Sequence, residues 1–209
     1  GLPFPNGSHS LLTNHIYFQP MRVLHVNTMD KNGGAARAAH RIHLALREGG
    51  IDSHMLVLHR SEPDCFVHAA LPTGGKVFQR LRHIVSTKVM ARQVSPTNTG
   101  HHSINLFSSG LANYINRSDF DIVNLHWIGD ELMSIEEIGH IRKPICWTMH
   151  DMWPFCGAEH LDDLNHPERY ISGYVAKTRP PLYSGPDLDA WTWRRKRRAW
   201  AAKTFHLIS

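Results

Sequence analysis

Short apolar runs alternate with helical patterns along most of this 209-residue chain. Runs typical of buried strands lie at residues 22–26, 54–58, 121–125, 144–148 and 203–209. Helices are predicted over residues 35–47, 74–93, 109–116 and 187–202, and a further helix should begin at Ser134, which forms a capping box with Glu137. This alternation predicts an α/β fold: a Rossmann-like parallel sheet, in a single domain, with helices on both faces.

Two polar segments interrupt the alternation. Residues 95–109 are rich in Asn, His and Ser and predict a loop that reaches over a cleft, and residues 152–186 predict a long excursion of the kind that often serves function. We expect residues 1–20 to be a tag or N-terminal extension, because Met21 stands directly before the first strand, and residues 21–209 to form the domain. The chain stops on a predicted strand, so we expect a fragment.

Composition narrows the class of protein. Hydrophobic residues make up 42% and charged residues 20% of the chain, which are globular values, and no apolar run approaches the ~20 residues that cross a bilayer. The three cysteines, Cys65, Cys146 and Cys156, are too few and too odd in number to suggest a disulfide framework. We therefore expect a reducing compartment, the cytoplasm.

A basic run, Arg194 to Arg198, lies among Trp191, Trp193 and Trp200. As part of a helix it should bury an aromatic side and leave the basic side in solvent. Basic and aromatic residues together also suit an anionic membrane surface or nucleic acid. We keep a peripheral contact with the inner face of the cell membrane as the alternative and expect no nucleic-acid partner.

The loop after the first strand contains Gly33 and Gly34 and leads into an Ala-rich helix. Glycines let a ligand approach the backbone, and the free amides and dipole of a helix N-terminus favour an anion such as phosphate. Arg37 could add a cation. The plainer alternative is that the two glycines only permit a tight connection between strand and helix.

Two later strands are also followed by residues suited to catalysis or ligand binding. One leads to His126 and Trp127, and another leads to His150, Asp151 and Trp153. Because parallel strands end at one edge of the sheet, these groups and the glycine loop should converge in one cleft. Either histidine could be structural, and the tryptophans could form a sugar platform or simply belong to the core.

These three motifs, in this order, resemble the N-terminal domain of a retaining family 4 glycosyltransferase of the GT-B class. The similarity covers about residues 21–209 and is greatest to bacterial enzymes of surface-polysaccharide biosynthesis. It implies transfer of a sugar from a nucleotide-sugar donor to a glycan or lipid-linked acceptor, with no metal or other cofactor. The family's second domain, which holds most donor contacts and a Glu-x7-Glu motif, has no counterpart here, so we expect the isolated chain to be inactive.

The resemblance also implies roles for individual residues. The glycine loop would lie near the donor phosphates, and His150 would face the transferring sugar. Retention in the family is explained without an obligatory protein nucleophile, because the leaving phosphate helps to deprotonate the acceptor. The expected catalytic residues are His150, Asp151 and His126. The expected substrate- and phosphate-binding residues are Gly33, Gly34, Arg37, Trp127, Trp153 and Glu159.

Three other interpretations remain open. A nicotinamide-binding domain would share the architecture, but the Gly-x-Gly-x-x-Gly pattern is missing and His59-Arg60 follow the second strand where an acid would hold the ribose. A non-catalytic module could bind an anion or membrane through Arg194 to Arg198. A metal site could use Cys156, His160 and His166 with Asp162 or Asp163, although this spacing fits no standard zinc pattern.

Overall fold

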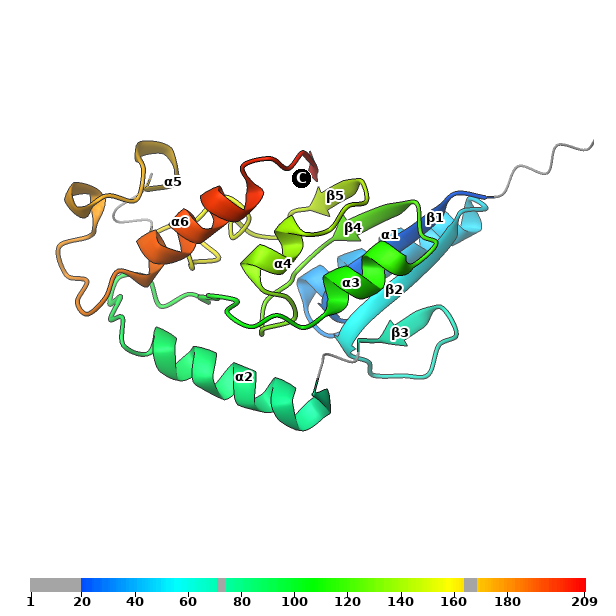
Figure 1. The fold of residues 1–209 in the computed structure, drawn as a ribbon, viewed down its shortest axis with the longest axis horizontal. Helices are drawn as coiled ribbons and strands as arrows, with labels where there is room; N and C mark the ends of the chain where they lie inside the picture. The colour runs from blue at the N-terminus through cyan, green and yellow to red at the C-terminus, as the bar shows by residue number, and fades with distance from the viewer. Residues whose placement is uncertain (1–19, 71–73, 164–168) are drawn as a thin grey trace, which may run out of the picture.

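The computed structural model describes residues 20–70, 74–163 and 169–209, so the predicted extension lies outside the described residues except for Pro20. Its centre is a six-stranded sheet in the order β3-β2-β1-β4-β5-β6, and every neighbouring pair is parallel (Figure 1). The strands are β1 (Arg22–Met29), β2 (Asp52–His59), β3 (Val67–Ala69), β4 (Ile122–Leu125), β5 (Ile145–Thr148) and β6 (Phe205–Ile208). The predicted α/β parallel fold is confirmed.

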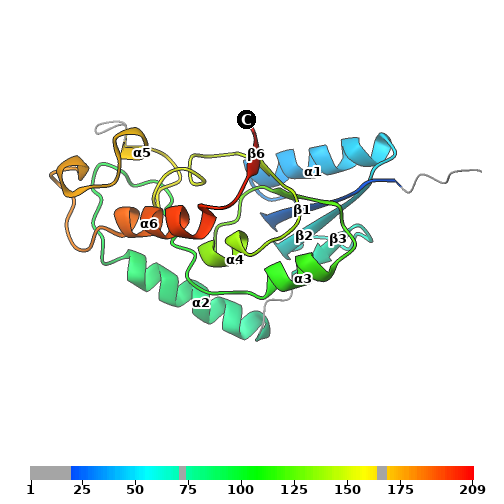
Figure 2. The same ribbon diagram turned by 45° about the horizontal axis from the view of Figure 1, so that its top comes forward.

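Helices cover both faces of this sheet, as predicted. The α-helices are α1 (Gly34–Glu48), α2 (Gly75–Met90), α3 (Leu111–Arg117), α4 (Ile135–Gly139), α5 (Arg169–Ser172) and α6 (Leu188–Trp200), and η1 (Ala176–Thr178) is a 3-10 helix. Figure 2 shows α1 on one face and α3 and α4 on the other. The sequence patterns missed β3, α5 and η1, each of which has only three or four residues and therefore little periodicity.

The core explains why the central strands read as continuous apolar runs. Leu24 and Val26 of β1 and Val123 and Leu125 of β4 are fully buried, because helices or loops cover both sides of these strands. Trp147 of β5 packs among Trp153, Trp200 and the ring of Phe205. None of the helices in the described ranges is both long and apolar enough to span a bilayer, and all three cysteines are free thiols.

One helix cap differs from its prediction. The Ser134 hydroxyl accepts a hydrogen bond from the amide of Glu137, as a capping box requires. The Glu137 carboxylate does not return this bond to Ser134; it accepts from the amide of Ser109 at 2.7 Å, from the Ser109 hydroxyl at 2.9 Å and from the amide of Ala112 at 3.1 Å. Glu137 therefore caps the start of α3, and the predicted reciprocal box is only half right.

Candidate functional site

The strand order places a topological switch point between β1 and β4. The chain leaves β1 toward β2 on one side, and β4 lies on the other side, so the loops that follow β1 and β4 diverge and leave a crevice at their carboxyl ends. Hydrogen bonds fix these two loops to each other. The amide of Trp127 donates to Oδ1 of Asn27, and the amide of Thr28 donates to the carbonyl oxygen of Trp127, both at 2.9 Å.

A cavity of about 270 Å³ opens at this switch point. Its lining is the end of β1, the first turn of α1 and one tryptophan: Asn27, Met29, Asn32, Gly33, Gly34, Ala35, Ala36 and Trp127. The structure thus brings together three of the predicted site residues, Gly33, Gly34 and Trp127. Arg37 lies on the same turn and is exposed, but it is not among the residues that line the cavity.

The two glycines differ in what the fold requires of them. Gly33 has a φ of 95°, which only glycine adopts without strain. A Cβ on Gly34 would meet no atom within 4 Å, so packing does not demand a glycine there. The first amide of α1 to bond within the helix is that of Arg37, which donates to the carbonyl oxygen of Gly33. The amides of Gly34, Ala35 and Ala36 are left as the unpaired donors of the helix start, beside the cavity.

Three histidines form a chain of contacts beside the cavity. Nδ1 of His25 lies 2.9 Å from Nε2 of His126, and Nδ1 of His126 lies 2.9 Å from Nε2 of His150. Burial lowers the pKa of His25 to about 3 and that of His126 to about 2, and it also lowers the pKa of half-buried His150. These imidazoles are therefore neutral near neutral pH, and each carries one hydrogen, either on Nδ1 or on Nε2.

The unpaired nitrogen of His25, at one end of the three histidines, sets the direction of the hydrogen bonds between them. Nε2 of His25 is buried without a hydrogen-bond partner. A buried N–H without an acceptor is less favourable than a lone pair without a donor, so the protons lie on Nδ1 of His25 and Nδ1 of His126. Nε2 of His150 then accepts, and its Nδ1 carries a hydrogen. This assignment, which rests on the hydrogen-bond network, makes His150 a donor.

His25 was not singled out by sequence reasoning. A histidine within the apolar run Val23 to Val26 of a buried strand is the signal that could have found it. Such a residue needs a polar partner inside the core, and His126 directly follows the adjacent strand β4.

Asp151 and Trp153 are held by the loops around them. Oδ2 of Asp151 lies 2.5 Å from Nδ1 of His160, and Oδ1 accepts from the amide of Trp153. The Trp153 indole is buried and donates to the carbonyl oxygen of Ser103. The crevice that these residues line with His126, His150 and Trp127 has a volume of only about 10 Å³. Trp153 therefore belongs to the core, whereas Trp127 borders both this crevice and the larger cavity.

Ser103, His160 and Asp151 have the connectivity of a hydrolase triad. Oγ of Ser103 lies 2.9 Å from Nε2 of His160, whose Nδ1 faces Asp151. However, Ser103 and His160 are only 6% and 4% exposed, and the amide of Ser103 donates to the carbonyl oxygen of Ala158. These contacts tie the 95–109 loop to the segment after β5.

Glu159 lies away from both hollows, in a buried polar cluster. The Tyr174 hydroxyl donates to its carboxylate, and Lys196 of α6 donates to the carbonyl oxygens of Gly157 at 2.7 Å and Cys156 at 3.2 Å. Burial, and after it the neighbouring Asp189 carboxylate, raises the pKa of Glu159, and burial lowers the pKa of Lys196. Glu159 lines neither of the hollows described above.

The basic run of α6 is only partly a solvated face, which corrects the prediction for Arg194 to Arg198. Lys196 is buried, and Arg195 bonds to the Glu136 carboxylate and to the carbonyl oxygen of Asn105. Trp191, expected on the buried side, is 37% exposed. The reason is that α6 packs on α4 and on the 95–109 loop, whose carbonyl groups need donors.

The residues of the alternative metal site have separate partners. His160 faces Asp151 and Ser103, Asp163 accepts from Tyr183, and Cys156 is buried. His166 lies outside the described residues. Within the described part of the chain no group of three or more His, Cys, Asp or Glu side chains is arranged to hold a metal ion.

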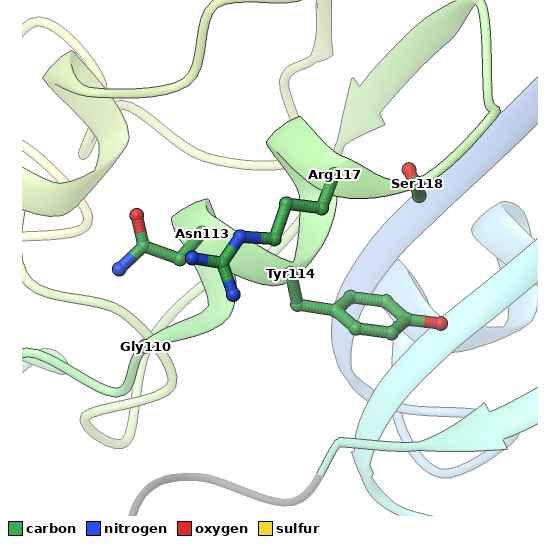
Figure 3. Close-up of a pocket in the computed structure, with 5 residues that line it drawn as sticks. All are labelled: Gly110, Asn113, Tyr114, Arg117 and Ser118. Carbon is green, nitrogen blue, oxygen red and sulfur yellow. The ribbon is translucent and has the colours of Figure 1, made fainter.

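A wider hollow of about 510 Å³ lies on α3 (Figure 3). It is lined by Gly110, Asn113, Tyr114, Arg117 and Ser118. None of the predicted site residues lines it, so the switch-point cavity remains the candidate site.

No protein-family model matches the chain, and no curated protein matches it significantly in sequence.

Proposed function

We propose that the chain is the N-terminal half of a retaining glycosyltransferase that transfers a sugar from a nucleotide-sugar donor to a polysaccharide or lipid-linked acceptor. One observation supports this most: the unpaired amides of Gly34, Ala35 and Ala36 border an open cavity at the switch point of a Rossmann-like sheet. Such amides and the dipole of a 15-residue helix favour a diphosphate.

In this proposal the helix start stabilises the departing diphosphate. As the bond between the sugar and the diphosphate breaks, negative charge develops on the phosphate oxygens, where fixed donors lower the barrier. The acceptor oxygen forms the new bond to the sugar, and its proton passes to the leaving phosphate. His150, with Nδ1–H as donor, would bind an oxygen of the transferring sugar, and His126 and His25 would keep it in that tautomer.

In this proposal most donor contacts come from a second domain outside these 209 residues. The isolated chain should therefore bind nucleoside diphosphates weakly and transfer no sugar. Arg37, Asp151 and Glu159 keep only supporting roles in it. Arg37 is exposed outside the cavity, the Asp151 carboxylate is bonded to Trp153 and His160, and the Glu159 carboxylate is bonded to Tyr174.

The test is a titration of the chain with uridine and guanosine diphosphates, followed by amide NMR. We expect millimolar binding that shifts the amides of Gly34, Ala35 and Ala36 first. Gly34→Leu should abolish these shifts, because its side chain would project into the space that is open above Gly34.

Arg41→Leu, an exposed change on the same helix, is the matched control and should leave binding intact. Shifts that map to the hollow on α3, or equal binding by Gly34→Leu, would contradict the proposal.

A further inference from the structure

The helix α2 presents its apolar side to solvent and its polar side to the protein. Val77 is 84% exposed, and Phe78, Leu81 and Ile84 are 50%, 51% and 40% exposed. In contrast, Gln79, Arg82 and Ser86 are buried. A surface helix normally turns its apolar stripe to the core, so this orientation needs an explanation.

Polar contacts hold α2 in this orientation. Nε2 of Gln79 donates to the carbonyl oxygens of Asp130 at 2.9 Å and Glu131 at 3.1 Å, and the Ser86 hydroxyl contacts the Glu131 carboxylate. Both views show α2 at the border of the fold, away from the sheet (Figures 1 and 2). The apolar stripe is therefore a fixed feature of the surface.

Basic side chains lie along this stripe, and the surrounding sequence has no acidic residue. From Cys65 to Ser118 the sequence contains no Asp or Glu and six Lys or Arg. Lys76, Arg80 and Lys88 are exposed on α2. At 3.6 residues per turn, Val77, Leu81 and Ile84 lie within about 60° of one another, Lys88 continues their stripe, and Lys76 and Arg80 flank it.

We propose that this face of α2 binds the surface of an anionic lipid bilayer. The apolar stripe would enter the boundary between headgroups and acyl chains, and the long Lys and Arg side chains would reach back to the lipid phosphates. A second copy of the chain fits less well, because symmetric pairing would bring Lys76, Arg80 and Lys88 of both copies together and α2 itself has no carboxylate to offset them. The inference does not depend on the proposed glycosyltransferase function.

The experiment is flotation of the chain with phosphatidylcholine vesicles, with and without phosphatidylglycerol. We expect binding to the anionic vesicles that falls as salt is raised. Val77→Ser with Leu81→Ser should weaken it at least tenfold while the circular dichroism spectrum stays unchanged, since both side chains are exposed. Lys76→Gln, Arg80→Gln and Lys88→Gln together should weaken it similarly.

The matched control removes three exposed arginines from α6: Arg194→Gln, Arg197→Gln and Arg198→Gln. This variant loses the same charge and should still bind. Equal loss in the control would mean that net charge, or α6, is responsible and would overturn the proposal. Concentration-dependent dimerisation through α2 without vesicle binding would also overturn it.

Discussion

Three neutral histidines in the core should make the protein sensitive to acid. His25, His126 and His43 are 0%, 2% and 1% exposed. Burial lowers the pKa of each, to about 3 for His25, about 2 for His126 and about 4 for His43, from an ordinary value of 6.5. Above pH 6.5 both the folded and unfolded chains keep these imidazoles neutral, so they do not make stability depend on pH there.

Below that pH, proton uptake decides whether the free energy of unfolding rises or falls with pH. The unfolded chain binds protons at these histidines and the folded chain does not, so the free energy of unfolding falls as the pH falls. Each histidine contributes about 1.4 kcal/mol per pH unit, which is about 2 kcal/mol near pH 5. Three histidines together remove about 6 kcal/mol, comparable with the ~5–15 kcal/mol total stability of an ordinary domain.

Urea unfolding at several pH values between about pH 7 and pH 5 measures this slope. We expect His43→Gln to lower the slope by about 1.4 kcal/mol per pH unit, because glutamine can keep the bond to the Ser53 hydroxyl but does not titrate. His206→Gln, the same change at an exposed site, is the control. A wild-type stability that does not fall with pH, or an unchanged slope in His43→Gln, would refute the reasoning.

Four further predictions concern the site and its supports. In the proposed full-length glycosyltransferase, His150→Ala should lower turnover at least about tenfold, or ~1.4 kcal/mol in the barrier, with an unchanged melting temperature; a parallel loss of thermal stability would make His150 structural. Nitrogen-15 NMR should find the hydrogen of His150 on Nδ1, and the opposite tautomer would reverse the direction of the histidine chain. Lys196→Met should reduce the unfolding free energy by roughly 3–5 kcal/mol, whereas exposed Lys177→Met should leave it within about 0.5 kcal/mol. Glu137→Gln should cost about 1–3 kcal/mol in urea unfolding, because three donors lose a charged acceptor.

The strands and long helices could be predicted because their periodicity is local. β1, for example, was expected at residues 22–26 and occupies Arg22–Met29, since only its final polar residues broke the apolar pattern. The convergence of Gly34 and Trp127 on one cavity also followed from the sequence, because it needs only parallel strands and the position of each motif after a strand.

Side-chain partners could not be predicted in the same way. Glu159 bonds Tyr174 and Arg195 bonds Glu136, and both pairings depend on how separate segments pack together. The exposure of the apolar stripe of α2 could not be predicted either. Its helical spacing was visible, but periodicity does not say which side of a helix faces the core, and here polar contacts to Asp130 and Glu131 decided it.

The position of Glu137 has a consequence for cooperativity. Its amide completes the start of α4 through Ser134, and its carboxylate completes the start of α3 through Ser109 and Ala112. Neither short helix is stable by itself, since α3 has seven residues and α4 has five. The two should therefore open together as one unit, so that their amides exchange hydrogen with a common free energy although 17 residues separate Arg117 from Ile135 in the sequence.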